Sequence, residues 1–173
     1  MITIRFATAS DAELIADISR RTFYETFALH NSKDNMDKFM NEQFTKEALI
    51  KEAGAEDNIF FLAYNRKEPV GYARMREGEN RPELNNKPSI EIARIYAVQS
   101  SIGKGVGKAL MEKCIEVSIE KKKEIIWLGV WQKNDRAIAF YSKFGFQKFA
   151  EHDFVLGDDV QTDWLMKKPL AGL

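Results

Sequence analysis

The sequence holds little that would support an extracellular or metal-dependent protein. Only one of its 173 residues is cysteine, so no disulfide can form within the chain. A reducing compartment suits such a chain, and we expect the cytoplasm. The two histidines, His30 and His152, have no cysteine or histidine at ligand spacing, so we expect no metal site. The one cysteine, Cys114, falls on an apolar helical stripe and is interpreted as a packing residue.

An excess of charge of one sign and long apolar runs are also missing. Lys and Arg number 26, as do Asp and Glu, and the formal net charge is zero. A general nucleic-acid binder needs a basic excess, so we expect no nucleic-acid partner. No run approaches the roughly 18 apolar residues of a membrane helix, so we expect no membrane partner either. With 45% hydrophobic and 30% charged residues, the chain has the composition of a soluble protein and the length of a single domain over residues 1–173.

Apolar periodicity predicts strands and helices that are mixed along the chain. We expect strands over 2–6, 59–64, 70–75, 90–98 and 125–131, and two more around a turn at 156–159. We expect a helix starting at the capping pattern Ser10-Asp11-Ala12-Glu13, and a helical region over 32–54 that Thr45 restarts. Further helices are expected over 105–123 and 137–144. The strand–helix–strand unit within 90–131 implies a parallel pair, and therefore an α/β fold.

The segment that most suggests chemistry follows the predicted strand 90–98. Gly103, Gly105 and Gly107 stand at the opening of the predicted helix. Glycine lets backbone approach a ligand closely, and a helix start offers unpaired N–H groups that suit a pyrophosphate. Lys104 and Lys108 would add positive charge at its rim. The run matches neither a Walker motif nor a dinucleotide fingerprint, so the glycines alone leave open a turn that merely tightens packing.

This segment and two later ones resemble the GNAT N-acetyltransferase family. The matching stretches are Ile95 to Lys108, Trp127 to Asn134, and Ala137 to Phe146. In that family a Q/R-x-x-G-x-G/A loop binds acetyl-CoA, and an N-x-x-A-x-x-F-Y-x-x-x-G-F element follows. The resemblance covers nearly the whole chain and implies a mixed, mostly antiparallel sheet of six to seven strands flanked by about four helices. It also implies direct transfer of acetyl from acetyl-CoA to a primary amine in a ternary complex.

The similarity extends to PaiA-type spermidine/spermine N-acetyltransferases. Matching stretches are 21–27, Asn31-Ser32 with Asn35-Met36, Trp127 to Trp131, and Gly157-Asp158 with 161–163. They imply a polyamine such as spermidine or spermine as the small-molecule acceptor. Other acceptors stay open (a protein N-terminus, a lysine or an aminoglycoside-like amine), as does a homodimer.

A third interpretation is an acetyl-CoA sensor without turnover. Two departures from the family patterns would favour it. Ile102 stands where the family usually has Gln or Arg, and Ala93 stands where PaiA-like chains tend to be acidic. The intact Tyr141 and the three glycines speak against it.

The resemblance implies roles for two groups in catalysis. Acetyl transfer requires the amine to lose a proton and benefits from a proton for the leaving thiolate. Tyr141 is the candidate acid, the alternative being a core aromatic residue. Glu91, on the strand before the glycine loop, is the candidate base, the alternative being an ion pair with Arg94 or Arg74.

Further residues are implied to bind the two substrates. Backbone at 95–97 would pair with the pantetheine arm, with the Ala97 N–H as oxyanion donor, and Asn134 would bond the pantetheine, cap a helix, or do both. The predicted cofactor-binding residues are Ile95, Tyr96, Ala97, Ile102, Gly103, Lys104, Gly105, Val106, Gly107, Lys108 and Asn134. The predicted acceptor-binding residues are Tyr24, Glu25, Asp34 and Glu42, because a cationic amine calls for carboxylates and aromatic faces. On helices, however, charged side chains usually form only solvated surface.

Overall fold

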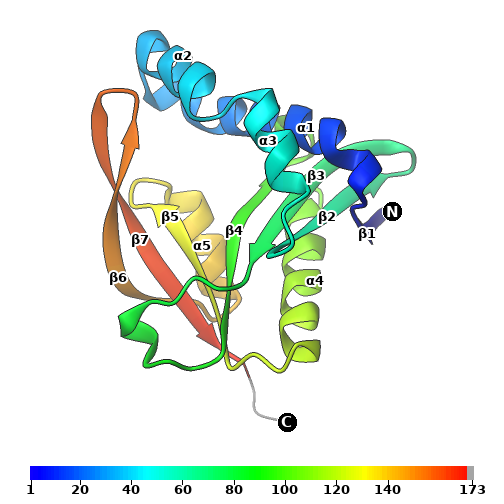
Figure 1. The fold of residues 1–173 in the computed structure, drawn as a ribbon, viewed down its shortest axis with the longest axis vertical. Helices are drawn as coiled ribbons and strands as arrows, with labels where there is room; N and C mark the ends of the chain where they lie inside the picture. The colour runs from blue at the N-terminus through cyan, green and yellow to red at the C-terminus, as the bar shows by residue number, and fades with distance from the viewer. Residues whose placement is uncertain (171–173) are drawn as a thin grey trace.

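The structure is a computed structural model that describes residues 1–170, and over this range it forms one seven-stranded sheet with five α-helices (Figure 1). The strands are β1 (Ile2–Phe6), β2 (Asn58–Asn65), β3 (Glu68–Arg76), β4 (Ser89–Ala97), β5 (Ile125–Trp131), β6 (Gln147–Leu156) and β7 (Asp159–Pro169). The helices are α1 (Ala12–Phe27), α2 (Lys33–Glu42), α3 (Lys46–Ala53), α4 (Val106–Glu120) and α5 (Asp135–Lys143). The predicted α/β fold is confirmed, with five helices where about four were expected.

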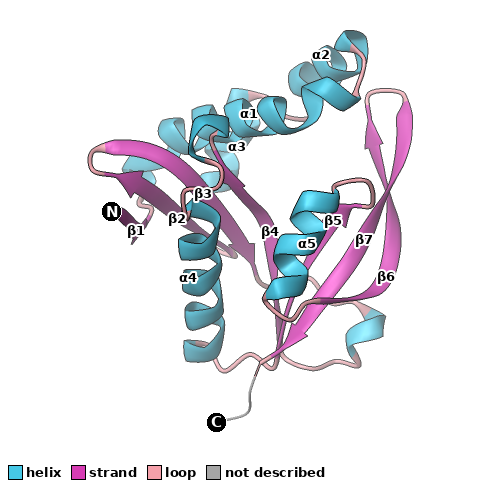
Figure 2. Ribbon diagram, turned by 180° about the vertical axis from the view of Figure 1, so that it is seen from behind, coloured by secondary structure: helices cyan, strands magenta, loops and turns pink. Residues whose placement is uncertain are grey.

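The strands lie in the order β1-β2-β3-β4-β5-β7-β6. All neighbours are antiparallel except β4 and β5, which α4 connects, so the predicted parallel pair is confirmed. Helices α1, α2 and α3 lie on one side of the sheet (Figure 1), and α4 and α5 lie on the opposite side (Figure 2). Both sheet faces are therefore covered, although most of the sheet is antiparallel.

The parallel strands β4 and β5 stay together over only part of their length. Ser89 to Ile92 pair with Ile125 to Leu128, and no pairing of β4 with β5 continues beyond this point within residues 1–170. A register shift coincides with this end: Arg74 pairs with Arg94 and Met75 with Ile92, which leaves Ala93 without a partner on β3. Such a bulge bends a strand and increases its twist. Residues 93–97 and 129–131 consequently present backbone edges that are not bonded to each other.

The starts of α2 and α3 are capped as predicted, and the start of α1 is capped by other residues than expected. Ser32 Oγ accepts from the Asn35 N–H at 3.1 Å and Thr45 Oγ1 accepts from the Ala48 N–H at 3.2 Å, so α2 and α3 begin as predicted. Helix α1 begins at Ala12, inside the predicted pattern Ser10–Glu13, but Thr8 and Asp11 form the capping box there. A short 3₁₀ turn over Ala9–Asp11 precedes α1, and the Asp11 carboxylate accepts from the Thr8 N–H at 2.7 Å.

Helix α4 packs its apolar stripe on the sheet and so fixes the glycine segment that precedes it. Val106, Leu110, Cys114 and Val117 are buried, as the periodicity predicts. Burial raises the pKa of the Cys114 thiol to about 12, so the thiol stays protonated and acts as a small apolar group.

Close approach of α4 to β3 requires a glycine, which gives a test of this packing. A Cβ on Gly71 would lie 2.7 Å from Val106 Cγ1 and 2.8 Å from the Tyr96 carbonyl oxygen. Gly71→Ala should lower the free energy of unfolding by about 1–3 kcal/mol, because the core must move to accept the methyl group. Urea denaturation measures the change.

Gly54→Ala is the matched control for this variant. Its nearest neighbour would be the Lys51 carbonyl oxygen at 3.6 Å, and Gly54 has a negative φ of −93°, so its stability should stay within about 0.5 kcal/mol of the parent. Equal stability of the two variants would contradict the packing of α4 on β3.

Candidate active site

A cleft of about 1050 Å³ opens where β4 and β5 separate. Its floor is formed by residues 93–97 of β4 and 129–131 of β5. One end is bounded by the segment before α4 and by α5. The other end is bounded by α1, by residues between 29 and 44 in and around α2, and by β7. The cleft therefore passes through the gap in the sheet, from the α4–α5 face to the α1–α3 face.

The glycine segment forms one wall with its backbone turned toward the cleft. Gly103 and Gly105 have φ values of 79° and 87°, and a Cβ on either would point into open space. Helix α4 begins directly afterwards, and its first amides have no intrahelical acceptor. Within residues 1–170, the N–H groups of 105–108 form no hydrogen bond. Four backbone donors without an acceptor and the positive end of a helix thus lie at this end of the cleft, where Gly105, Gly107 and Lys108 line it.

Cationic side chains gather at the same end. The cleft is lined here by Lys108, Lys133, Arg136 and Lys143, with Asp135 as the acidic residue among them. Together with the free amides, they form an environment that favours an anion. Of the predicted cofactor-binding residues, nine line the cleft: Ile95, Tyr96, Ala97, Ile102, Gly103, Gly105, Gly107, Lys108 and Asn134. Val106 instead points into the core, and Lys104 does not line the cleft.

Helix α5 starts at the cleft and directs Tyr141 toward it. Asn134 Oδ1 accepts from the Ala137 N–H at 3.2 Å, so Asn134 caps α5 while also lining the cleft. Tyr141 packs edge-on against Phe140 and Phe146 and also lines the cleft. Burial raises the pKa of its phenol well above the ordinary value, so the hydroxyl remains a proton donor at neutral pH.

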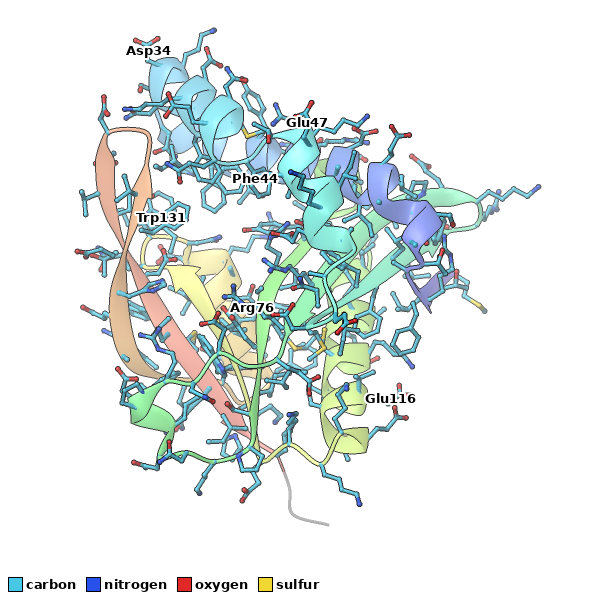
Figure 3. All side chains as sticks on the ribbon, in the orientation of Figure 1. Asp34, Phe44, Glu47, Arg76, Glu116 and Trp131 are labelled. Carbon is cyan, nitrogen blue, oxygen red and sulfur yellow. The ribbon has the colours of Figure 1, made fainter. Side chains whose placement is uncertain are left out.

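The opposite end of the cleft is largely aromatic. Its lining includes Phe23, Phe27, Phe39, Phe44, Trp131 and Phe154. Phe23 stacks on Phe39 with ring centres 4.6 Å apart, and the ring centres of Trp131 and Phe27 lie 6.3 Å apart. Figure 3 shows Trp131 and Phe44 below α2 and α3, on the side of those helices that faces the sheet. This lining suits an aliphatic chain or an alkylammonium group.

The predicted acceptor-binding residues are not brought together. Glu25 lines the cleft, but its carboxylate is engaged: Oε1 accepts from Arg21 Nε at 2.9 Å and Oε2 from the Gln99 N–H at 2.8 Å. Tyr24, Asp34 and Glu42 lie outside the cleft lining and are exposed. Figure 3 places Asp34 at the outer end of α2.

Glu91 also lies outside the cleft. Arg76 donates to its Oε2 through Nε at 2.9 Å and Nη2 at 2.7 Å, and Glu91 is 9% exposed. The ion pair considered for Glu91 is thus present, but with Arg76 rather than Arg94 or Arg74. The bulge at Ala93 is the reason, because the shifted register sets Arg76 opposite Glu91.

The structure adds an acidic residue that the sequence did not single out. Asp163 of β7 lines the cleft, and its Oδ2 lies 3.4 Å from Nε2 of His152 on β6. Burial raises the pKa of the Asp163 carboxyl, and the neighbouring His152 partly opposes that rise. Asp163 falls in the 161–163 stretch that resembles PaiA-type enzymes, but only the strand register shows where its side chain lies.

Other stretches with this resemblance contact one another beside the cleft, and Gln161 among them lines it. Asn35 Oδ1 accepts from the Asp158 N–H at 3.0 Å, Lys38 pairs with Asp158, and Gln161 donates to Asn31 Oδ1 at 2.7 Å. Gly157 has a φ of 64°, and its Cβ would lie 2.5 Å from Asn35 Oδ1. These contacts tie α2 to the β6–β7 turn.

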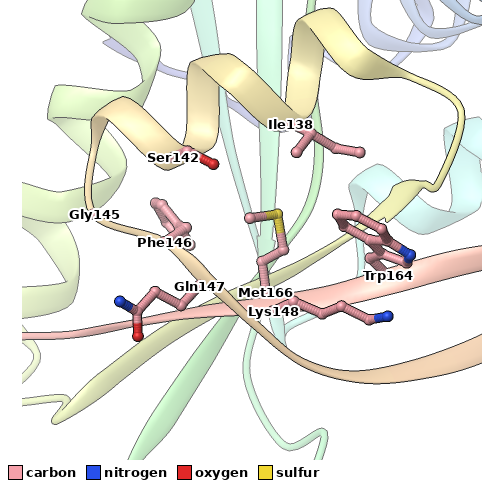
Figure 4. A pocket seen from close by; sticks show the side chains of 8 residues that line it. All are labelled: Ile138, Ser142, Gly145, Phe146, Gln147, Lys148, Trp164 and Met166. Carbon is pink, nitrogen blue, oxygen red and sulfur yellow. The ribbon is translucent and has the colours of Figure 1, made fainter.

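A second hollow, of about 410 Å³, lies between α5 and strands β6 and β7 (Figure 4). None of the eight described residues that line it carries a carboxylate, imidazole or thiol. Lys148 is its charged residue, and its Nζ lies 4.5 Å from the centre of the Trp164 ring. The larger cleft is therefore the candidate active site. In the described part of the chain, no cluster of three metal-ligating side chains occurs, and no helix is long and apolar enough to cross a membrane.

Comparisons with known proteins agree with this geometry. Residues 15–146 match the family described as "Acetyltransferase (GNAT) family". An uncharacterized N-acetyltransferase of Lactobacillus delbrueckii subsp. lactis is 39% identical over 159 residues, which cover 92% of this chain and 91% of the relative. The chain belongs to the GNAT acetyltransferase family and is an acyltransferase of the N-acetyltransferase type.

Two further similarities come from Thermoplasma acidophilum. A spermidine N(1)-acetyltransferase of that organism is 25% identical over 173 residues, covering 96% of each chain. The crystal structure of its PaiA N-acetyltransferase in complex with coenzyme A aligns with a TM-score of 0.76 at 22% identity, covering 98% of this chain and 99% of that one. The structural likeness confirms the GNAT fold.

Proposed function

We propose that this protein transfers the acetyl group of acetyl-CoA to a primary amine, and that the amine is a polyamine such as spermidine or spermine. The free amides of residues 105–108, in a cleft end lined by four cations, carry the proposal. They offer what a pyrophosphate needs, and they face the same cleft as a buried phenol. Acetyl-CoA supplies the activated acyl group when it is bound.

The residues present fit coenzyme A in three respects. Gly103 and Gly105 leave room for the diphosphate against the backbone, because a Cβ would project into the cleft there. Residues 93–97 of β4 offer a strand edge that an extended pantetheine arm would pair with, as a peptide adds to a sheet. Lys108, Lys133, Arg136 and Lys143 would offset the phosphate charges. The Ile102 N–H donates to the Gln99 carbonyl oxygen at 3.3 Å, so the amides of residues 105–108 are the proposed phosphate donors in place of a Gln or Arg side chain.

Tyr141 is the proposed proton donor to the leaving sulfur. Its raised pKa keeps the phenol neutral, which a donor requires. The Ala97 N–H lies on the free edge of β4 and is the proposed donor to the thioester oxygen. Asn134 would hold the pantetheine through its side-chain amide while its Oδ1 caps α5.

The polyamine part of the proposal has two supports. The spermidine N(1)-acetyltransferase of Thermoplasma is similar over nearly the full chain. The acceptor end also combines aromatic faces with the Asp163 carboxylate, which suits an aliphatic chain that carries ammonium groups.

A panel of acceptors tests this proposal. The purified protein is incubated with acetyl-CoA and one acceptor (spermidine, spermine, an alanine-terminated peptide, a lysine peptide or kanamycin), and free thiol is followed. We expect turnover with spermidine and spermine. Turnover restricted to a peptide or to kanamycin would overturn the polyamine assignment. Coenzyme A binding without thiol release from any acceptor would instead indicate a sensor.

A charge reversal at the glycine segment tests the phosphate site. Gly105→Glu places bulk and negative charge against the free amides, so coenzyme A affinity should fall below detection by isothermal titration calorimetry. Gly78→Glu is the control, because Gly78 has a similar φ of 88° and open surroundings but lies outside the cleft. Retained affinity in Gly105→Glu would place the phosphate site elsewhere.

Removal of one hydroxyl tests the proton donor. Tyr141→Phe should lower kcat by on the order of 10²–10⁴-fold, with little change in the KM for acetyl-CoA, because only the transition state receives the proton. Steady-state kinetics with the fastest panel acceptor measure both constants. An unchanged kcat would remove Tyr141 from the mechanism.

A further inference from the structure

We propose that Asp163 binds the acceptor ammonium group and takes its proton, with His152 as its positioning residue. This inference rests on the proposed function and assigns the base that acetyl transfer requires. An amine with a pKa near ~10.4 is almost wholly protonated at neutral pH, so some group must accept a proton before the nitrogen can attack.

The side chains of three neighbouring strands converge here. Trp131 of β5 pairs with Asp163 of β7, which pairs with His152 of β6. Directly paired residues project from the same face of a sheet. The Trp131 ring lies 5.3 Å from the His30 ring and 6.3 Å from that of Phe27, so this is the face that α1 covers. Asp163 consequently faces the aromatic end of the cleft.

Elimination among the carboxylates of the cleft points to the same residue. Three of the described lining residues are acidic: Glu25, Asp135 and Asp163. Glu25 is held by Arg21 and the Gln99 N–H, and Asp135 lies in the first turn of α5 at the cationic end. The nearest basic group to Asp163 is an imidazole rather than a guanidinium or ammonium group. Its carboxylate is thus available to a cationic ligand at the aromatic end.

The space in front of the pair is kept open by a missing side chain. A Cβ on Gly129 would lie 3.8 Å from both Asp163 Oδ2 and His152 Nε2. Gly129 is not among the residues with positive φ, so its backbone conformation does not require glycine. The neighbouring position on the floor of the cleft is Ala93, where β4 offers no carboxylate. A primary amine would reach Asp163 across these two small residues.

The acceptor nitrogen loses two protons in this step. Asp163 accepts one proton from the ammonium group, and the nitrogen lone pair forms a C–N bond to the acetyl carbonyl carbon. The C–S bond breaks with its electron pair on sulfur, which takes the Tyr141 proton. The nitrogen loses a second proton, which restores the Tyr141 hydroxyl. The proton held by Asp163 then returns to solvent, which reaches the 42% exposed side chain of His152 beside it.

Several titratable groups face the same part of the cleft. They are His152 from β6, Tyr96 and Arg94 from β4, His30 after α1, and Tyr141 from α5. Arg94 is engaged by Glu52, and the raised pKa values of Tyr96 and Tyr141 keep both phenols neutral over the assay range. Glu25 of α1 also lines the cleft, so a change of rate on the acidic side reports on Asp163, on Glu25 or on an imidazole, which single variants distinguish.

Asp163→Asn tests the proposal, with Asp153→Asn as control because Asp153 is an exposed neighbour on β6. Thiol release from acetyl-CoA is measured with spermidine, or with the panel amine that the wild type uses fastest, from pH 6 to 9. Asp163→Asn should lower kcat/KM at pH 7 by on the order of 10²–10⁴-fold. Its deficit should shrink as rising pH deprotonates more of the amine, while calorimetry shows unchanged coenzyme A affinity.

His152→Gln tests the positioning role. Because His152 lowers the pKa of Asp163, its removal should move the acidic limb of the kcat/KM profile to higher pH and leave the rate near pH 9 almost unchanged. An unshifted limb would remove His152 from the proposal. If Asp163→Asn kept the wild-type rate at pH 7, the proposed role of Asp163 would be overturned, while the proposed function would stand. Absence of wild-type turnover with every amine would overturn the proposed function as well.

Discussion

The architecture of the site depends on how briefly two parallel strands stay together. β4 and β5 pair over four residues each and then separate at the bulge of Ala93. A sheet that continued intact would seal the two helical faces from each other, because backbone hydrogen bonds would close the gap. Separation leaves a passage with a strand edge on each side. The glycine segment and α5 stand at one mouth of this passage, and the aromatic residues of α1, α2 and β5 stand at the other.

The two mouths differ in their electrostatics, and that difference orients the chemistry. Free amides and four cationic side chains attract an anionic group at one mouth, while aromatic rings and a carboxylate suit a cation at the other. Tyr141 and Asp163 lie along the route between them. A donor substrate and an acceptor that enter from opposite sides would therefore meet inside the sheet, which is what direct transfer between two bound substrates requires. Contacts between α2 and the β6–β7 turn join two of the elements that line the aromatic mouth.

Features that depend on neighbours in sequence were predicted well. The α4 stripe, the caps at Ser32 and Thr45, and β5 follow from spacing alone, and the glycine segment has a signature of its own. Features that depend on how distant strands pair were not predicted. Asp11 pairs with Arg5 of β1 and forms the capping box with Thr8, where Ser10 and Glu13 were expected to form it. Glu91 pairs with Arg76 because a bulge shifts its partner, and Asp163 contacts His152 only because β7 lies between β5 and β6. The predicted acceptor-binding residues on the early helices are of the types that a cationic amine calls for. Three of them are exposed to solvent, however, and only Glu25 lines the cleft.

The central claim is that backbone amides before and within the first turn of α4 hold the diphosphate of coenzyme A. The most direct measurement is a titration of ¹⁵N-labelled protein with coenzyme A, followed by amide chemical shifts in two-dimensional NMR. Our account predicts that the largest shifts occur at Gly103, Gly105 and Gly107 and at residues between them, with smaller shifts along 93–97. Saturable binding that leaves these amides unmoved and shifts a different surface would contradict it.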